Sequence, residues 1–113
     1  MKDNLIQALH SIANKKVLLI GDIILDRYLF GSVDRISPEA PVPVLSFSHE
    51  KYVPGGASNV ASNIASLGGQ VMILGVVGND TRKEIILDEL RKRKVNCASV
   101  IIDKTRQTIE KAR

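Results

Sequence analysis

The sequence predicts an α/β fold built on a mainly parallel sheet. Residues 17–20 and 71–77 are continuous apolar runs, the pattern of strands that are buried on both faces. Segments in which apolar residues recur at helical spacing alternate with these runs along the chain. Alternating strands and helices imply parallel strands joined by right-handed crossovers, so we expect a layered domain of strands covered by helices.

The chain begins with the pattern of a short amphipathic helix over residues 4–14. We expect this helix to pack on the edge of the structure that follows. Its apolar side chains at helical spacing are Leu5, Ile6, Leu9, Ile12 and Ala13. The first strand, residues 17–20, then leads into the run Gly21-Asp22-Ile23-Ile24-Leu25-Asp26.

Residues 28–54 form an excursion from the main sheet. This stretch contains all four prolines of the chain, together with apolar residues that partly alternate, such as Val42 and Val44. Proline cannot donate a hydrogen bond to a neighbouring strand, so we expect edge strands or a hairpin flap here.

The second half of the chain returns to alternating helices and strands. A helix over residues 57–67 follows Gly55-Gly56, carries Val60, Ile64 and Leu67 on one side, and is ended by Gly68 in the left-handed conformation. The remaining expected elements are a strand over 71–77, a capping turn at 79–81, a helix to about Arg93 with Ile85, Ile86 and Leu90 facing inward, and strands over 95–102 and 108–112.

Composition places the chain among ordinary globular domains. Its 113 residues, 44% hydrophobic and 25% charged, suffice for one small domain or part of a larger one. The single cysteine, Cys97, fits a reducing compartment and is expected to be a buried thiol. The first residues do not form a signal peptide, and no apolar run is long enough to cross a membrane. We therefore expect a cytoplasmic protein without a membrane partner.

The formal net charge of +4 comes from the C-terminal third of the chain. Residues 82–113 hold ten Lys and Arg against five Asp and Glu. Residues 91–94 are all basic, and at the end of a helix they are expected to form a solvated face that complements the helix dipole. No aromatic side chain for base stacking lies nearby, so nucleic acid is not an expected partner. His10 and His49 lack nearby ligands, and we expect no metal site.

Two carboxylates at the end of the first strand form the first candidate site. Ligands bind beyond the carboxyl ends of parallel strands, where Asp26 lies, and Asp22 precedes it by four residues. If the strand stays extended, both side chains point the same way and can accept hydrogen bonds from the hydroxyls of a polyol. The alternative is structural: Asp26 caps a turn, and Asp22 pairs with Arg27 or Arg35.

The second candidate site is the run Gly55-Gly56-Ala57-Ser58-Asn59, with Asn63 following. Paired glycines allow close approach of a ligand to a helix N-terminus, and Asn59 and Asn63 lie on one helix face. The alternative is an ordinary turn in which Ser58 or Asn59 caps the helix. The run is neither a Walker A loop nor a GxGxxG fingerprint, so classical nucleotide sites are not supported.

Several motifs resemble the opening of a carbohydrate kinase of the ribokinase (PfkB) family. They are Gly21-Asp22-Ile23-Ile24-Leu25-Asp26, Gly55-Gly56-Ala57-Ser58-Asn59-Val60-Ala61, Leu67-Gly68-Gly69 and Val76-Val77-Gly78-Asn79-Asp80. Within that family, the run Arg35-Ile36-Ser37-Pro38-Glu39-Ala40-Pro41 resembles the kinases of D-glycero-β-D-manno-heptose 7-phosphate, which form one half of a bifunctional enzyme. The match is firm over residues 17–80 and looser beyond them.

The resemblance implies a ribokinase-like, three-layer αβα fold and roles for single residues. Asp26, Gly55, Gly56 and Asn59 match positions that contact the sugar in the family. Residues 28–54 would be a β lid that closes over the substrate and builds a homodimer. Lys111 and Arg113 lie two apart on an expected strand, and either could hold the 7-phosphate.

The resemblance also implies that this chain is an incomplete N-terminal portion. The family's Gly-Ala-Gly-Asp motif, which supplies the anion hole and the general base, and its ATP pocket lie beyond residue 113. We therefore expect a parent kinase that uses ATP and Mg²⁺, with no catalytic, cofactor-binding or metal residue in this chain and no activity of this chain alone. The alternatives are a kinase for another sugar or a nucleoside, and a non-catalytic dimeric ligand-binding module.

Overall fold

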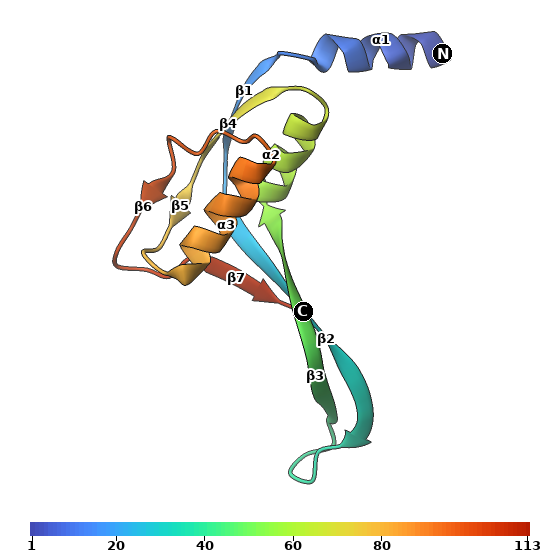
Figure 1. The fold of residues 1–113 in the computed structure, drawn as a ribbon, viewed down its shortest axis with the longest axis vertical. Helices are drawn as coiled ribbons and strands as arrows, with labels where there is room; N and C mark the ends of the chain where they lie inside the picture. The colour runs from blue at the N-terminus through green and yellow to red at the C-terminus, as the bar shows by residue number, and fades with distance from the viewer.

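The computed structural model describes residues 1–113 as an elongated molecule of 58 × 42 × 20 Å. In Figure 1, α1 projects from one end, a long hairpin from the other, and the remaining elements form the body between them. The elements in chain order are α1 (Lys2–Ile12), β1 (Lys16–Ile20), β2 (Ile23–Ile36), β3 (Pro43–Gly56), α2 (Ala57–Ser66), β4 (Gln70–Leu74), β5 (Val76–Val77), α3 (Thr81–Lys92), β6 (Ile101–Ile102) and β7 (Ile109–Ala112).

The strands pair in parallel everywhere except in the hairpin. β1 pairs with β4, β2 with β7 and β5 with β6 in parallel, whereas β2 pairs with β3 antiparallel. The expected strand over residues 71–77 is divided at Gly75, where a Cβ would lie 2.6 Å from the carbonyl oxygen of Gly21. This close approach requires glycine. The predicted α/β architecture is confirmed, and its strands are arranged in three small sheets.

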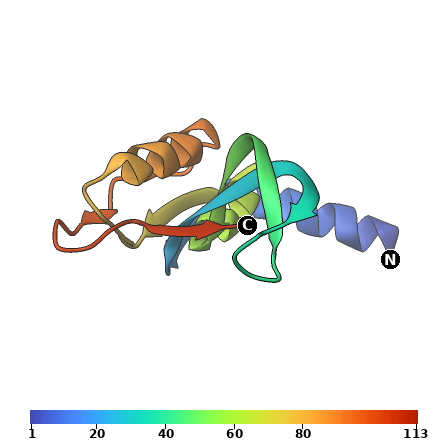
Figure 2. The same cartoon turned by 90° about the horizontal axis from the view of Figure 1, so that it is seen from below.

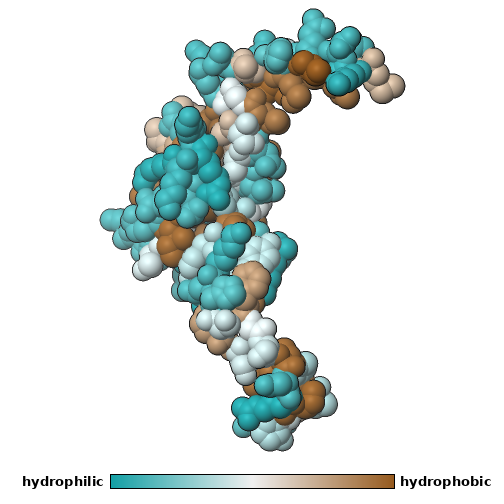
Figure 3. Space-filling view, turned by 45° about the vertical axis from the view of Figure 1, so that its right-hand side comes forward, coloured by the Kyte–Doolittle hydropathy of each residue, from teal (hydrophilic) through white to brown (hydrophobic).

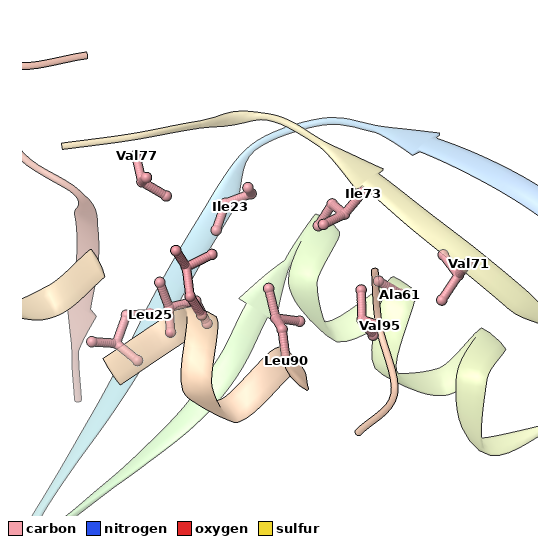
Figure 4. Packing of buried hydrophobic residues seen from close by; sticks show 10 residues of the cluster. Ile23, Leu25, Ala61, Val71, Ile73, Val77, Leu90 and Val95 are labelled. Atoms are coloured by element: carbon pink, nitrogen blue, oxygen red, sulfur yellow. The ribbon is translucent and has the colours of Figure 1, made fainter. Parts of the chain in front are cut away.

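The hydrophobic core lies between the strands and the helices α2 and α3. Figure 4 shows labelled side chains from β2, β4, α2 and α3 pointing toward one another, and Figure 2 shows α3 on one side of the strands. The buried hydrophobic residues are Ile23, Leu25, Ala61, Val71, Ile73, Val77, Ile86, Leu87, Leu90 and Val95. As predicted, Ile86 and Leu90 face inward, with Ile85 packed against the cluster. In α2 the fully buried residues are Ser58 and Ala61, and on the expected apolar side Ile64 packs against the cluster while Val60 and Leu67 are about half exposed.

Two expectations about burial at the N-terminal end of the molecule are wrong. β1 is covered on one face only, and on the other face Leu18 and Ile20 are 58% and 68% exposed. α1 has no buried residue, because it extends away from the body instead of packing on its edge. Figure 3 shows apolar side chains along this projecting helix. An apolar stripe predicts a helix, but it does not specify which surface covers it.

The expected excursion is a hairpin of two 14-residue strands, β2 and β3. The register runs from Ile23 opposite Gly56 to Ile36 opposite Pro43, with irregularities after Phe30 and after Val33. β3 is an edge strand, where proline is tolerated although it has no N–H to donate to a further strand. The predicted hairpin flap is therefore confirmed.

The C-terminal part contains less strand than the sequence predicts. Of residues 95–102, only Ile101–Ile102 form a strand, with an isolated bridge between Met72 and Asn96. β7 agrees with the strand expected over 108–112. Cys97 is partly buried, and this burial raises the pKa of its thiol, while the charge of Arg91 acts in the opposite direction. None of the helices is long and apolar enough to span a bilayer.

Asp80 joins the start of α3 to the start of β7. As predicted, it caps α3, since its carboxylate accepts a hydrogen bond of 2.8 Å from the Lys83 N–H. The same carboxylate accepts bonds of 2.8 and 2.7 Å from the N–H and hydroxyl of Thr108. Burial acts to raise the pKa of Asp80, but these hydrogen bonds outweigh it and the net shift is downward. The carboxylate form therefore stabilises the fold.

We expect Asp80→Ala to lower the free energy of unfolding by about 2 kcal/mol at neutral pH, the upper range for loss of a helix cap. Because the folded-state pKa lies below the unfolded value of about 3.9, the stabilisation is present above that pH and is lost as the pH falls through the folded-state pKa. Urea unfolding between pH 7 and pH 3 measures this effect. The difference from wild type should shrink on acidification, and exposed Asp88→Ala is the control. A pH-independent difference would contradict the role of the charge.

Candidate functional site

Asp26 is a nearly buried carboxylate on the central strand of the sheet β3-β2-β7. It is 8% exposed and lies between Val53 of β3 and Lys111 of β7 in the register. Burying a carboxylate is costly unless it has a partner. The turn-capping alternative does not hold, because Asp26 lies within β2.

The partner of Asp26 is Arg113. The Nη2 atom of Arg113 lies 3.4 Å from Oδ2 of Asp26, and the guanidinium stands 5.5 Å from the centre of the Tyr28 ring. The Arg113 backbone is fixed by hydrogen bonds of 2.8 Å from its N–H to the Arg27 carbonyl and from the Leu29 N–H to its own carbonyl. Arg113 thus compensates the charge of Asp26 and packs against Tyr28.

The glycine pair allows the backbone to approach Asp26 and to turn into α2. A Cβ on Gly55 would lie 2.6 Å from Cγ of Asp26 and 2.7 Å from both carboxylate oxygens. Gly56 has a φ of 55°, and after it the Ala57 N–H donates a 2.9 Å hydrogen bond to the Asp22 carbonyl. Gly56 is itself the N-cap, with no side-chain cap, so neither Ser58 nor Asn59 has the capping role of the alternative interpretation.

Asp26, Asn59 and Asn63 face one cavity of about 810 Å³. The two asparagines are one helical turn apart on α2, as predicted, so their amides lie on the same helix face. The cavity is lined by Asp26, Tyr28, Val53, Pro54, Asn59, Ser62, Asn63, Ala65, Ser66, Lys92, Arg93, Lys94 and Arg113. Around one cavity, a carboxylate can accept hydrogen bonds from several hydroxyl groups, and two amides can both accept hydrogen bonds from such groups and donate hydrogen bonds to them.

Asp22 does not share this cavity. The strand is interrupted after Ile20 and resumes at Ile23, so the alternation that would align Asp22 with Asp26 is lost. Asp22 lines a separate cavity of about 300 Å³ with Gly75 and neighbouring residues, and its pairing with Arg27 or Arg35 is not seen either. The expectation that both carboxylates lie on one face is therefore wrong.

Lys111 and Arg113 also have different surroundings. Arg113 lines the cavity, whereas Lys111 is exposed and does not line it, although it stands opposite Asp26 in the register. Sequence reasoning missed Tyr28 and Lys92–Lys94 as lining residues. Tyr28 lies two residues after Asp26 on the same strand face, and this spacing could have indicated it. Placement of the basic end of α3 beside α2 is a tertiary effect that local sequence does not signal.

The profile of the family described as pfkB family carbohydrate kinase matches residues 14–112. The chain belongs to this family. As a pfkB family chain, it is 50% identical over 99 residues to bifunctional protein HldE of Helicobacter acinonychis (strain Sheeba), an alignment that covers 88% of this chain and 21% of the relative. It is 41% identical over 113 residues to bifunctional protein HldE of Caulobacter sp. (strain K31), covering 100% of this chain and 23% of the relative. The chain thus spans about a fifth of the length of these curated relatives.

Solved structures show the same fold. Fructokinase from Vibrio cholerae O395, in its fructose-, ADP- and calcium-bound form, matches with a TM-score of 0.67 and 27% identity over 87% of this chain and 27% of that one. Fructokinase with bound ATP from Xylella fastidiosa matches with a TM-score of 0.67 and 24% identity, over 88% and 29% of the two chains. The pfkB family chain therefore has a ribokinase-like α/β fold and covers under a third of each of these solved chains.

Proposed function

We propose that this chain is the sugar-binding and lid portion of an ATP-dependent carbohydrate kinase that phosphorylates D-glycero-β-D-manno-heptose 7-phosphate at the anomeric hydroxyl. The observation that carries the proposal is the cavity shared by Asp26, Asn59 and Asn63 in a chain of the pfkB family. The choice of a heptose phosphate is supported by the run Arg35-Ile36-Ser37-Pro38-Glu39-Ala40-Pro41, through its resemblance to heptose 7-phosphate kinases.

The residues of this chain bind and orient the sugar. The Asp26 carboxylate accepts hydrogen bonds from sugar hydroxyls, and the amides of Asn59 and Asn63 can both donate and accept. Gly55 keeps the space beside Asp26 free of a side chain, so the carboxylate retains its position. Holding the accepting hydroxyl in one place lowers the entropic part of the barrier to phosphoryl transfer.

The parent protein would supply the remaining chemistry. There ATP would donate the phosphoryl group, and Mg²⁺, when bound, would stabilise the charge on it. No group of three or more His, Cys, Asp or Glu side chains gathers in this chain. The resemblance to the family implies that the Mg²⁺ ligands, the ATP contacts and the general base belong to the rest of the parent protein, and the proposal assigns none of them to this chain. In this proposal the parent acts in the cytoplasm, where ATP is available.

The β2–β3 hairpin is proposed as the lid. Asp26 and Tyr28, near the start of β2, and Val53 and Pro54, near the end of β3, line the cavity. Movement of the hairpin over a bound sugar would exclude water, so that ATP is not hydrolysed instead.

A panel of acceptors tests the substrate assignment. The whole protein that contains this chain is assayed with ATP and with heptose 7-phosphate, unphosphorylated heptose, fructose, ribose and a nucleoside. The expected result is a kcat/KM for heptose 7-phosphate at least tenfold above that of any other acceptor. Preference for an unphosphorylated sugar or a nucleoside would support the alternative kinase of the same family, and transfer to none of them would support a non-catalytic module.

The exposed apolar side chains of the hairpin support a homodimer through the lid. They are Phe30, Val33, Ile36, Val42, Leu45 and Phe47. An element that exposes several large apolar side chains is a candidate protein contact. We expect Phe47→Glu to convert the whole protein from dimer to monomer in sedimentation-velocity measurements, with unchanged far-UV circular dichroism. Lys51→Glu, on the same strand, reverses a charge at an exposed site and serves as the control. A monomeric wild-type protein, or a dimeric Phe47 variant, would refute the proposed contact.

A further inference from the structure

The basic end of α3 lines the same cavity as Asp26. Lys92, Arg93 and Lys94 contribute to its wall together with Arg113, so four cationic side chains and a single carboxylate surround the space. A cavity with this excess of positive charge attracts anions. Hydrogen bonds between sugar hydroxyls and Asp26 or the two asparagines do not require this excess of positive charge.

Two of the four cations already have close partners. Arg113 is paired with Asp26. Arg93 donates hydrogen bonds of 2.5 and 2.9 Å to the carboxylate and the carbonyl of Glu89. Lys92 reaches the same carboxylate only at 3.4 Å, and its side chain is 71% exposed. Lys94 forms no ion pair and no side-chain hydrogen bond.

The backbone holds Lys94 beside the cavity. Its φ is 65°, in the left-handed region, and its N–H donates a 3.0 Å hydrogen bond to the Arg91 carbonyl at the end of α3. It also borders a neighbouring groove next to β1 and β4. A lysine of defined backbone position without a carboxylate partner is suited to an external anion.

The cavity is elongated along α2. The α2 residues that line it run from Asn59 to Ser66, and at the rise of an α-helix this corresponds to roughly 10 Å. Gly55, which shortly precedes the start of α2, closely approaches Asp26, whereas Lys94 lies near Ala65 in the last turn of α2, since both line the neighbouring groove. The lining residues of α2 therefore span about the length of a small sugar phosphate, with Lys94 near their C-terminal end.

We propose that Lys92 and Lys94 bind the phosphate group of a sugar phosphate whose hydroxyls are held by Asp26. The ligand class is a sugar that carries a phosphate group at one end and hydroxyl groups that reach Asp26 and the two asparagines. This inference rests on the proposed function and adds the residues that select a phosphorylated acceptor. It leaves Arg113 to position Asp26.

The test compares Lys94→Gln and the double variant Lys92→Gln/Lys94→Gln with Lys104→Gln in the whole protein. Lys104 is exposed, has no ion-pair partner and lies away from the cavity, so it controls for the loss of one charge. We expect the KM for heptose 7-phosphate to rise about tenfold in Lys94→Gln and further in the double variant, with kcat nearly unchanged, because a charge-assisted contact is lost. The KM for unphosphorylated heptose should not change, and Lys94→Arg should retain most of the affinity.

A purely structural role would give a different result. Cations also stabilise the carbonyls at the end of a helix, and their loss would lower the melting temperature without separating the two sugars. An unchanged KM in the double variant, or an equal rise for both sugars, overturns the phosphate subsite.

A binding measurement separates this inference from the proposed function. Calorimetric titration of wild type and the double variant with heptose 7-phosphate, in the absence of ATP, needs no turnover. If the wild-type protein binds the phosphorylated sugar but transfers no phosphoryl group, the kinase function fails while the subsite stands. If both proteins bind it equally, the subsite fails whatever the activity.

Discussion

We expect Asp26→Asn to lower kcat/KM for the sugar at least 100-fold in the whole protein. The carboxylate can accept two hydroxyl donors, and a hydrogen bond to a charged group contributes about 1.5–3 kcal/mol. An asparagine retains one oxygen acceptor and loses the charge. It also leaves Arg113 without its carboxylate partner at the wall of the cavity. Initial-rate kinetics with the sugar as varied substrate measures the effect.

Asp34→Asn is the matched control for this substitution. Asp34 lies on the outer part of the same strand, is exposed and has no ion-pair partner, so its loss should change kcat/KM less than twofold. Equal thermal unfolding of the Asp26 variant and wild type would show that the fold is retained. A near-normal kcat/KM in a folded Asp26→Asn protein would remove Asp26 from the sugar site.

We expect Gly55→Ala to abolish sugar binding and to lower the free energy of unfolding by about 1–3 kcal/mol, the range for an overpacked interior. The added methyl group would lie 2.6–2.7 Å from the carboxyl group of Asp26, which must then move or rotate. Calorimetry with the sugar and urea unfolding measure the two consequences separately.

The double variant Gly55→Ala/Asp26→Ala identifies the cause of the damage. Removing the carboxyl group removes the three atoms that the new methyl group would meet, so stability should recover relative to Gly55→Ala while sugar binding stays absent. If Gly55→Ala is fully stable and binds the sugar normally, the close approach of Gly55 to Asp26 has no functional importance.

The sequence predicts well those features that depend on local chemistry. Gly68 adopts the positive φ expected at a helix end, and Asp80 caps α3. The prolines indicate a hairpin, and Pro43 and Pro54 fall on its edge strand. The shared cavity of Asp26 and Asn59 was also predictable, because one residue ends a buried strand segment and the other begins the following helix.

Features set by contacts between distant segments were not predictable. An extended strand was expected to bring Asp22 beside Asp26, but the chain bends at Gly21, where it meets Gly75. The basic character of residues 91–94 is explained locally by their place at the end of a helix. Nothing in the sequence therefore indicated that these residues line a cavity. Their apolar composition predicted that Leu18 and one side of α1 would be buried. Leu18 is exposed, however, and α1 has no buried residue.

The length of the β2–β3 hairpin has a mechanical consequence. The nine residues from Tyr28 to Ile36 extend for about 30 Å at the rise of a strand, and the register irregularities after Phe30 and Val33 interrupt the ladder between them. Such an arm acts as a lever, in which a rotation of about 10° at its base displaces the tip by about 5 Å. Large travel at the end of the arm therefore requires only small torsional adjustments near its root, where Asp26 and Tyr28 line the cavity.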